Sequence, residues 1–152
     1  MKKTVIIVSL LMVMALLAAG CSEKPALNLP DKKITIFKSP TCGCCEIYSK
    51  YMEKQGFEVE VSNSYDMSSV KSKYNVPAQL GSCHTTIVGN YFVEGHVPAE
   101  AIIKLLTEKP DIAGIGMPGM PSGSPGMPGA KQGDFVIYSV GKDGSTNEFM
   151  RI

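Results

Sequence analysis

Four cysteines in two short segments place the strongest constraint on how this chain can fold. Three of them lie within Cys42-Gly43-Cys44-Cys45, and the fourth follows much later, in Ser82-Cys83-His84-Thr85. Thiolates packed this densely repel one another and oxidise easily, so they are seldom present for packing alone. Dithiol redox chemistry and the binding of a soft metal ion both account for them. We predict a fold that brings Cys83 to the other three sulfurs.

The N-terminal residues have the features of a secretory signal peptide. Lys2 and Lys3 precede an apolar run over 5–19, which is shorter than the roughly 20 residues that a membrane span needs. Small residues then lead to Cys21, as at the lipidation site of a bacterial lipoprotein, although the preferred leucine is displaced by one position. We expect Cys21 to be lipidated. An ordinary cleaved signal followed by a spare cysteine is the alternative.

The predicted organisation is a signal peptide over 1–20, a lipidated tether over 21–31 and one domain over 32–152. Such a protein would be exported and held at the periplasmic or cell-surface side by its lipid anchor only. Removal of the two leading lysines changes the formal net charge from +1 to −1. No basic patch remains, so nucleic acid is not expected as a partner. An exported protein can keep disulfides.

The hydrophobic pattern predicts alternating strands and helices, with a CxxC motif between the first strand and the first helix. This β-α-β-α-β-β-α order indicates an α/β, thioredoxin-like fold with a mixed four-stranded sheet and flanking helices. A C-terminal β-hairpin would extend the sheet or cap the site. The expected strands are 33–38, 57–61, 85–88 and 91–93, the helices are 45–55, 66–74 and 98–109, and the hairpin pairs 134–140 with 146–152.

Residues 115–131 repeat a Gly-Met-Pro-Gly unit and are predicted to form a loop, because Gly and Pro at this density break both helices and strands. Met117, Met120 and Met127 lie in this loop, where there is no core periodicity. Thioether sulfur prefers Cu(I) to zinc, so Met117 and Met120 are candidate metal ligands of a weaker class than the cysteines. Packing of the loop over the sheet is the alternative.

Cys42 and Cys45 have CxxC spacing at a strand-to-helix junction, where the helix N-terminus lowers the pKa of the first thiol. This arrangement suits disulfide exchange and metal binding equally, so Cys42 and Cys45 are the catalytic pair if the site is redox-active. A purely structural disulfide is the alternative.

Cys44 favours the metal hypothesis, because a third thiol beside an exchanging pair invites scrambled disulfides. Side chains of adjacent residues diverge, so Cys44 and Cys45 suit different Cu(I) ions of a thiolate cluster better than one tetrahedral zinc. Zinc bound by Cys42, Cys45, Cys83 and one further ligand stays open as the alternative.

Cys83 precedes the third predicted strand, at the place where a thioredoxin-like fold usually carries a cis-proline against the CxxC motif. Neighbouring side chains in an extended chain point to opposite faces. Cys83 is therefore the stronger candidate ligand and His84 the weaker one. An isolated histidine is more often a core or surface residue than a ligand, and His96 belongs to that weaker class.

Taken together and in this order, the motifs resemble those of the CopG-like family, long catalogued as a domain of unknown function in bacterial copper-resistance loci. The resemblance runs from about residue 34 to the C-terminus. It implies an exported thioredoxin-like protein that binds Cu(I) in a multi-copper cluster, with a redox role in copper detoxification. It also implies that the metal ligands are Cys42, Cys44, Cys45 and Cys83. The motifs are 38–45, 82–85, 94–100 and 117–121.

Three hypotheses follow. The first, which we favour, is a Cu(I)-binding protein of copper resistance or homeostasis, with copper ions and other copper-handling or redox proteins of the envelope as partners. The second is an enzyme, a thiol–disulfide oxidoreductase of the cell envelope. The third is a disulfide-stapled lipoprotein with an interaction role.

Overall fold

The computed structural model describes residues 31–152 of the 152-residue chain. The predicted signal peptide (1–20), the lipidation site Cys21 and almost all of the tether (21–31) lie outside the described residues. Within the described part, no helix combines the length and the apolar character needed to cross a bilayer.

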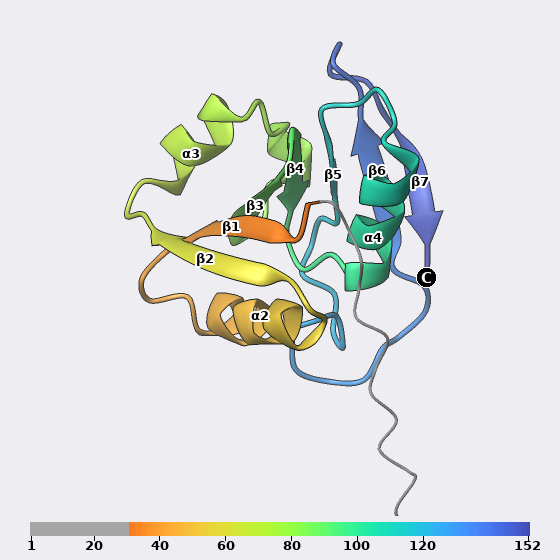
Figure 1. Cartoon of the computed structure of the whole chain (residues 1–152). Coiled ribbons are helices and arrows are strands. Elements are labelled where there is room, and N and C mark those ends of the chain that lie inside the picture. The colour runs from red at the N-terminus through yellow and green to blue at the C-terminus, as the bar shows by residue number, and fades with distance from the viewer. Residues whose placement is uncertain (1–30) are drawn as a thin grey trace, which may run out of the picture.

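A mixed seven-stranded sheet organises the described residues (Figure 1). The strands follow the spatial order β2-β1-β3-β4-β5-β6-β7. The β1/β2 and β4/β5 pairs are parallel and the other pairs are antiparallel. The strand bounds are β1 Lys33–Lys38, β2 Glu58–Asn63, β3 His84–Val88, β4 Tyr91–Glu94, β5 Gly114–Gly116, β6 Val136–Val140 and β7 Thr146–Arg151.

The predicted four strands are present as β2-β1-β3-β4, but the prediction of a four-stranded sheet was wrong in extent. β5 joins this unit to the predicted C-terminal hairpin, β6 and β7. The loop expected from Ile115 onward therefore begins only after Gly116. Glycine makes this extra strand possible, because a Cβ at Gly114 would collide with the carbonyl oxygen and ring of Phe92 on β4. Periodicity alone gives no signal for a strand of Gly-Ile-Gly.

Within residues 31–152, three α-helices and a short 3-10 helix accompany the sheet. The helix α2 begins two residues before the predicted start, because the Cys42 carbonyl already accepts a hydrogen bond from the Glu46 N–H at 3.3 Å. Cys42 is thus the N-cap residue of α2, and this places the CxxC motif across the helix start. The helix bounds are α2 Gly43–Lys54, α3 Met67–Lys73, α4 Ala99–Glu108 and η1 Ala78–Leu80.

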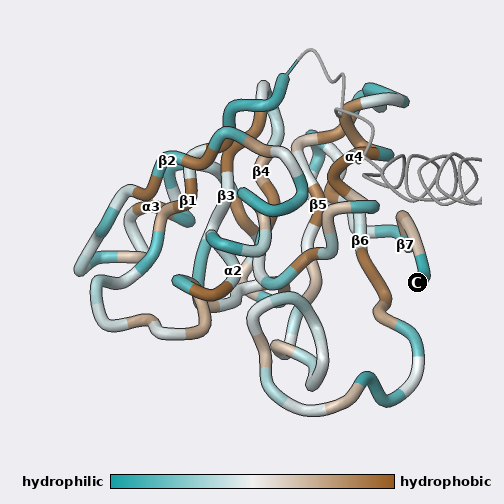
Figure 2. Tube along the Cα trace, turned by 60° about the horizontal axis from the view of Figure 1, so that its bottom comes forward, coloured by the Kyte–Doolittle hydropathy of each residue, from teal (hydrophilic) through white to brown (hydrophobic). Residues whose placement is uncertain are grey.

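The two faces of the sheet carry separate apolar clusters, because successive strand residues point to opposite sides. The larger cluster joins β1, β3, β4 and β6 to Tyr48 and Met52 of α2 and to Ile102 and Leu105 of α4. The smaller cluster, around Leu80, Phe92 and Val140, lies on the other face beside α3. Figure 2 shows the hydrophobic residues concentrated along the strands and the polar ones at many of the turns. The larger cluster packs α2 against the sheet through Tyr48 and Met52.

Asp66 is the N-cap residue of α3, and its side chain accepts hydrogen bonds from the Ser68 hydroxyl, the Ser69 hydroxyl and the Ser69 N–H. These bonds lower the pKa of Asp66 to about 2, and the bond from the Ser69 hydroxyl has the largest effect. A lowered folded-state pKa means that the cap stabilises α3 above the unfolded-state pKa of about 4 and loses this effect as the pH falls to about 2.

We therefore expect hydrogen exchange in α3 to accelerate between about pH 4 and pH 2 beyond its intrinsic pH dependence. Asp66→Asn keeps a capping oxygen but cannot titrate, so this extra acceleration should disappear in that variant. An identical pH profile in both proteins would contradict the assignment.

Candidate metal centre

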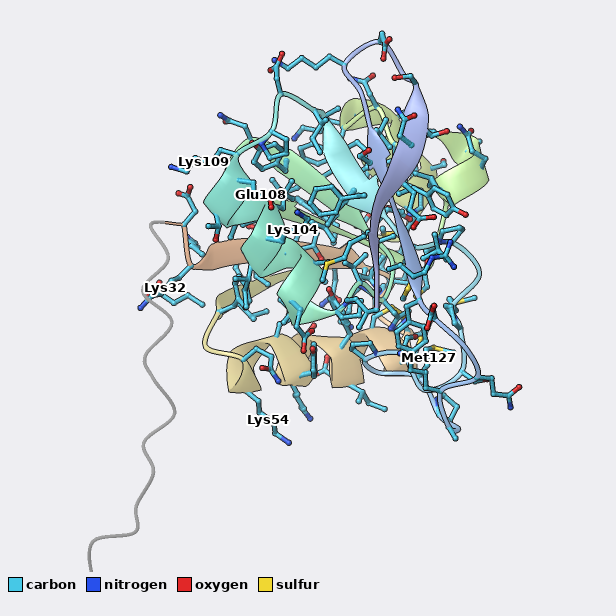
Figure 3. All side chains as sticks on the ribbon, turned by 90° about the vertical axis from the view of Figure 1, so that its right-hand side faces the viewer. Lys32, Lys54, Lys104, Glu108, Lys109 and Met127 are labelled. Carbon is cyan, nitrogen blue, oxygen red and sulfur yellow. A yellow bond between two sulfur atoms is a disulfide. The ribbon has the colours of Figure 1, made fainter. Side chains whose placement is uncertain are left out.

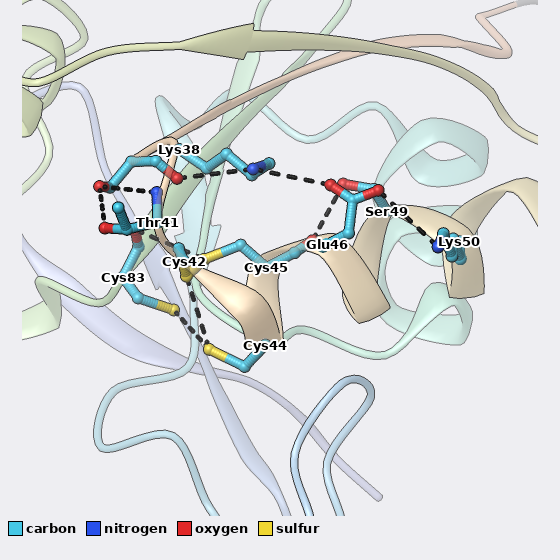
Figure 4. Close-up of polar contacts among 10 residues, drawn as sticks. Lys38, Thr41, Cys42, Cys44, Cys45, Glu46, Ser49, Lys50 and Cys83 are labelled. Atoms are coloured by element: carbon cyan, nitrogen blue, oxygen red, sulfur yellow. Dashed lines mark hydrogen bonds and ion pairs between the residues drawn. A yellow bond between two sulfur atoms is a disulfide. The ribbon is translucent and has the colours of Figure 1, made fainter.

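Four sulfur atoms converge at the N-terminal end of α2 (Figure 4). Cys42, Cys44 and Cys45 come from the start of the helix, and Cys83 comes from the bend just before β3. The four sulfurs all lie within 4.8 Å of one another. Cys44 Sγ is 3.5 Å from Cys42 Sγ and 3.9 Å from Cys83 Sγ. The predicted convergence of two distant chain segments is thus confirmed.

Within this cluster, a disulfide joins Cys42 and Cys45. Cys44 and Cys83 are the two thiols that residues 31–152 leave outside a disulfide, and both are half-buried. The cluster therefore holds an oxidised pair and a reduced pair in contact. Exchange between them needs no large movement of the chain.

Two imidazoles complete the cluster around Cys83. His96 Nε2 lies 3.0 Å from Cys83 Sγ, and His84 Nδ1 lies 3.4 Å from the same sulfur. The three donor atoms are close enough to hold one metal ion together. The expectation that Cys83 and His84 point to opposite faces was wrong, because Cys83 lies in a bend rather than in the strand, so the alternation does not apply.

The tautomer of His96 follows from its hydrogen bonds. His96 Nδ1 is 2.6 Å from the Pro125 carbonyl oxygen. A carbonyl can only accept, so Nδ1 carries the proton and Nε2 turns its lone pair toward the sulfurs. A metal-binding imidazole typically has this arrangement, with its other nitrogen held by a carbonyl.

Burial keeps these groups neutral when no metal is bound. Burial, followed by the neighbouring Cys44, raises the pKa of the Cys83 thiol to about 11. Burial, followed by the neighbouring His96 imidazole and the Lys71 ammonium group, lowers the pKa of His84 to about 3, and burial also lowers the pKa of His96. Neutral imidazoles are ready to bind a metal, whereas the Cys83 proton must leave when one binds.

The loop between β5 and β6 covers the cluster. Gly126 lies so close to α2 that an added Cβ would be 2.8 Å from the Cys44 carbonyl oxygen and 3.0 Å from the Tyr48 nitrogen. Its positive φ of 85° also favours glycine. Together with the Pro125–His96 hydrogen bond, this contact holds the loop over the start of α2.

The methionines of this loop occupy different environments. Met117 is buried in the larger apolar cluster, and Met120 is 41% exposed. Met127 lines a shallow hollow together with Cys44, Ile47 and Pro128, and Figure 3 shows it near the start of α2. Of the three, Met127 is the one that the structure brings beside a cluster cysteine.

Sequence reasoning undervalued His96 and missed the ion pair between the buried Glu94 and the half-buried Lys71, which lies next to Ser82 and Thr85 on either side of Cys83-His84. The signal for Glu94 and His96 lay in the motif 94–100, where a charged residue and a histidine interrupt an apolar stretch. Lys71 had no sequence signal, because the surface of α3 carries several other polar residues.

These observations define an α/β domain with a cysteine–histidine cluster capable of binding a metal ion. The model of a family described as a protein of unknown function, DUF411, matches residues 80–127, which include Cys83, His84 and His96. The chain is also similar to two solved structures of copper resistance protein CopG. Form 2 has 40% identity and a TM-score of 0.74, covering 79% of this chain and 97% of that chain. Form 1 has 40% identity and a TM-score of 0.73, covering 79% and 96%.

The chain therefore belongs to the DUF411 family and is a homologue of copper resistance protein CopG. The search of curated proteins returned no match.

Proposed function

We propose that this protein is an exported Cu(I)-binding protein of copper resistance or homeostasis, and that its domain is thioredoxin-like. Copper is its cargo, held by Cys42, Cys44, Cys45 and Cys83. The mutual approach of these four sulfurs to within 4.8 Å carries the proposal. The copper resistance function named for its homologues supports the choice of metal.

The donor set fits Cu(I) in its chemistry. Thiolates are soft ligands that favour Cu(I) and zinc over hard cations, and imidazole is an intermediate ligand that also suits copper. His84 Nδ1 and His96 Nε2 lie 3.4 Å and 3.0 Å from Cys83 Sγ, so two imidazole nitrogens stand beside the sulfurs as further ligands. Adjacent Cys44 and Cys45 suit a cluster of several copper ions, whereas a single tetrahedral zinc would use fewer of the donors present.

The Cys42–Cys45 disulfide gives the site a resting form that binds copper poorly. Two electrons and two protons from a dithiol of another envelope protein would convert this disulfide into two thiols. Copper binding then releases thiol protons as the thiolates form. Reduction would thus switch the cluster from two available sulfurs to four.

We expect the fully reduced protein to bind Cu(I) about tenfold more tightly than the disulfide form, because two further thiolates join the ligand set. Competition with a Cu(I) chelator under anaerobic conditions, together with a count of free thiols and bound copper, measures this difference. The control is Cys42→Ser/Cys44→Ser/Cys45→Ser under the same reductant. A reduced wild-type protein that competes no better than this variant would end the copper proposal.

A second candidate function is thiol–disulfide exchange in the cell envelope. The observation in its favour is the Cys42–Cys45 disulfide at a helix N-terminus, with Cys44 Sγ 3.5 Å from Cys42. In the direction that an insulin-reduction assay follows, dithiothreitol first reduces the Cys42–Cys45 disulfide. The Cys42 thiolate then attacks a substrate disulfide, and the Cys45 thiol resolves the mixed disulfide, so the substrate is reduced and the pair is oxidised again. Turnover in insulin reduction that is lost in Cys42→Ser would support the enzyme, and inactivity would leave copper binding alone.

The anchor and the partners are part of the proposal. Lipidation of Cys21 would tether the domain at the periplasmic or cell-surface side, where copper-handling or redox proteins of the envelope could reach the cluster. Metabolic labelling with a fatty-acid probe, compared between the wild type and Cys21→Ser, tests the anchor directly.

A further inference from the structure

Glu94, the last residue of β4, is fully buried although it carries a carboxylate. Its Oε1 atom accepts a hydrogen bond from the Ser82 N–H at 2.6 Å and pairs with the Lys71 ammonium group. Its Oε2 atom accepts a hydrogen bond from the Thr85 hydroxyl at 2.6 Å. A charged group so far from water persists only where its partners are this complete.

The two hydrogen-bond partners lie on either side of the cluster residues. Ser82 immediately precedes Cys83, and Thr85 immediately follows His84. One carboxylate therefore holds both ends of the segment that supplies a sulfur and an imidazole to the site. Lys71 also donates to the Thr85 hydroxyl oxygen at 3.2 Å, which ties α3 to the same point.

The neighbouring backbone strengthens this attachment. Thr85 and Glu94 are paired in the β3/β4 ladder, and the Gly95 N–H donates to the His84 carbonyl at 3.1 Å. A Cβ at Gly95 would lie 2.8 Å from both the Met117 carbonyl oxygen and Ser82 Oγ. The segment before β3 is thus fixed to the end of β4, which in turn leads directly to His96.

The ion pair of the buried Glu94 with the partly exposed Lys71 is a weak source of stability, because removing the carboxylate from water offsets most of the attraction. What a carboxylate supplies that an apolar side chain cannot is a fixed position for two donors at once. We propose that Glu94 is a positioning residue that sets where Cys83 stands relative to Cys44. This inference deepens the proposed copper function, since the same distance decides whether the sulfurs can share ions.

The test measures the Cys44–Cys83 distance without copper. Dibromobimane becomes fluorescent only after thiols have displaced both of its bromides, so it reports two thiols that stand close together. With the Cys42–Cys45 disulfide intact, Cys44 and Cys83 are the two free thiols among residues 31–152, so they are the pair that the reagent can join. Cys83→Ser gives the background signal.

Glu94→Gln and Glu94→Asp separate position from charge. The glutamine amide keeps an oxygen for the Ser82 N–H and offers its NH₂ group to the Thr85 oxygen. Bridging, the rate at which dibromobimane cross-links Cys44 to Cys83, should therefore stay within about twofold of wild type. Aspartate keeps the charge but is one methylene shorter and cannot reach both donors, so bridging should slow about tenfold. If Glu94 acted through its charge, Glu94→Asp would bridge at close to the wild-type rate and Glu94→Gln would bridge slowly.

Ile137→Ala is the control for general loss of stability, because Ile137 is buried in β6 and belongs to the larger apolar cluster. We expect folded Ile137→Ala to bridge within about twofold of wild type. If Glu94→Asp fails to fold, Thr85→Val replaces it, since that variant removes the Oε2 contact and the Lys71 hydrogen bond to the same hydroxyl but keeps both Oε1 contacts. Bridging at the wild-type rate in a folded Glu94→Asp or Thr85→Val protein overturns the inference.

The result is also separable from the copper proposal. Normal Cu(I) binding by wild type with unchanged bridging in the Glu94 variants would reject only the positioning role. Failure of wild type to bind Cu(I), with slowed bridging in Glu94→Asp, would reject copper and retain the positioning role.

Discussion

Replacement of Cys83 by serine is expected to lower the affinity for Cu(I) by about 100-fold or more. Loss of a residue that only supports a metal ligand already costs roughly 10- to 100-fold, and Cys83 is placed to be a ligand itself. It is the sulfur that links the donors, because it lies 3.9 Å from Cys44 Sγ and 3.0 Å from His96 Nε2. Serine keeps the size of the side chain but offers a hard oxygen that Cu(I) avoids.

The matched control for this experiment is Met52→Leu. Met52 is also a buried sulfur-containing residue, but it lies in the apolar cluster beneath the sheet, so its loss should leave Cu(I) affinity unchanged. Anaerobic competition with a chelator measures the affinity, and a copper count gives the stoichiometry. Equal affinities for Cys83→Ser and Met52→Leu would mean that copper binds through the α2 cysteines without the second segment.

The convergence of sulfurs could be predicted because it depends on few features. A CxxC motif at a strand-to-helix junction puts Cys42 and Cys45 at one end of a helix. A residue just before β3 reaches that same end whenever β3 runs antiparallel beside β1, as it does here, with Lys38 paired to His84. The local sequence pattern and the order of the strands were therefore sufficient to predict that the sulfurs converge, and the conformation of the loops was not needed.

The rest of the site depends on contacts between distant segments, which local pattern does not encode. His96 becomes part of the cluster only because Pro125, 29 residues later, accepts its Nδ1 proton. In the sequence, Glu94 is a single polar residue at the end of a strand. Its proposed positioning role can be inferred only from its contacts with Ser82 and Lys71. The strand β5 was missed for the same reason, since its Gly-Ile-Gly sequence is specified by close approach to Phe92.

Replacement of Gly126 by alanine is expected to lift the β5–β6 loop from the site and to destabilise the domain by about 2–4 kcal/mol. The new Cβ would meet the Cys44 carbonyl oxygen and the Tyr48 nitrogen, and these backbone atoms of α2 cannot rotate away. It would also stand 3.1 Å from His96 Nδ1, against the hydrogen bond to Pro125. Urea denaturation measures the stability, and the rate of maleimide alkylation of Cys44 measures the opening of the loop.

Gly119→Ala is the matched control, because Gly119 has almost the same backbone conformation in the same loop. Its φ is 83° against 85° for Gly126, but nothing lies within 4 Å of the Cβ that alanine would add. Both variants carry the strain of alanine at positive φ, roughly 1 kcal/mol, and only Gly126→Ala adds the collision. We therefore expect faster Cys44 alkylation and displaced His96 resonances in Gly126→Ala alone. If the two variants behave alike, backbone strain explains both, and close contact between loop and helix does not hold His96 in place.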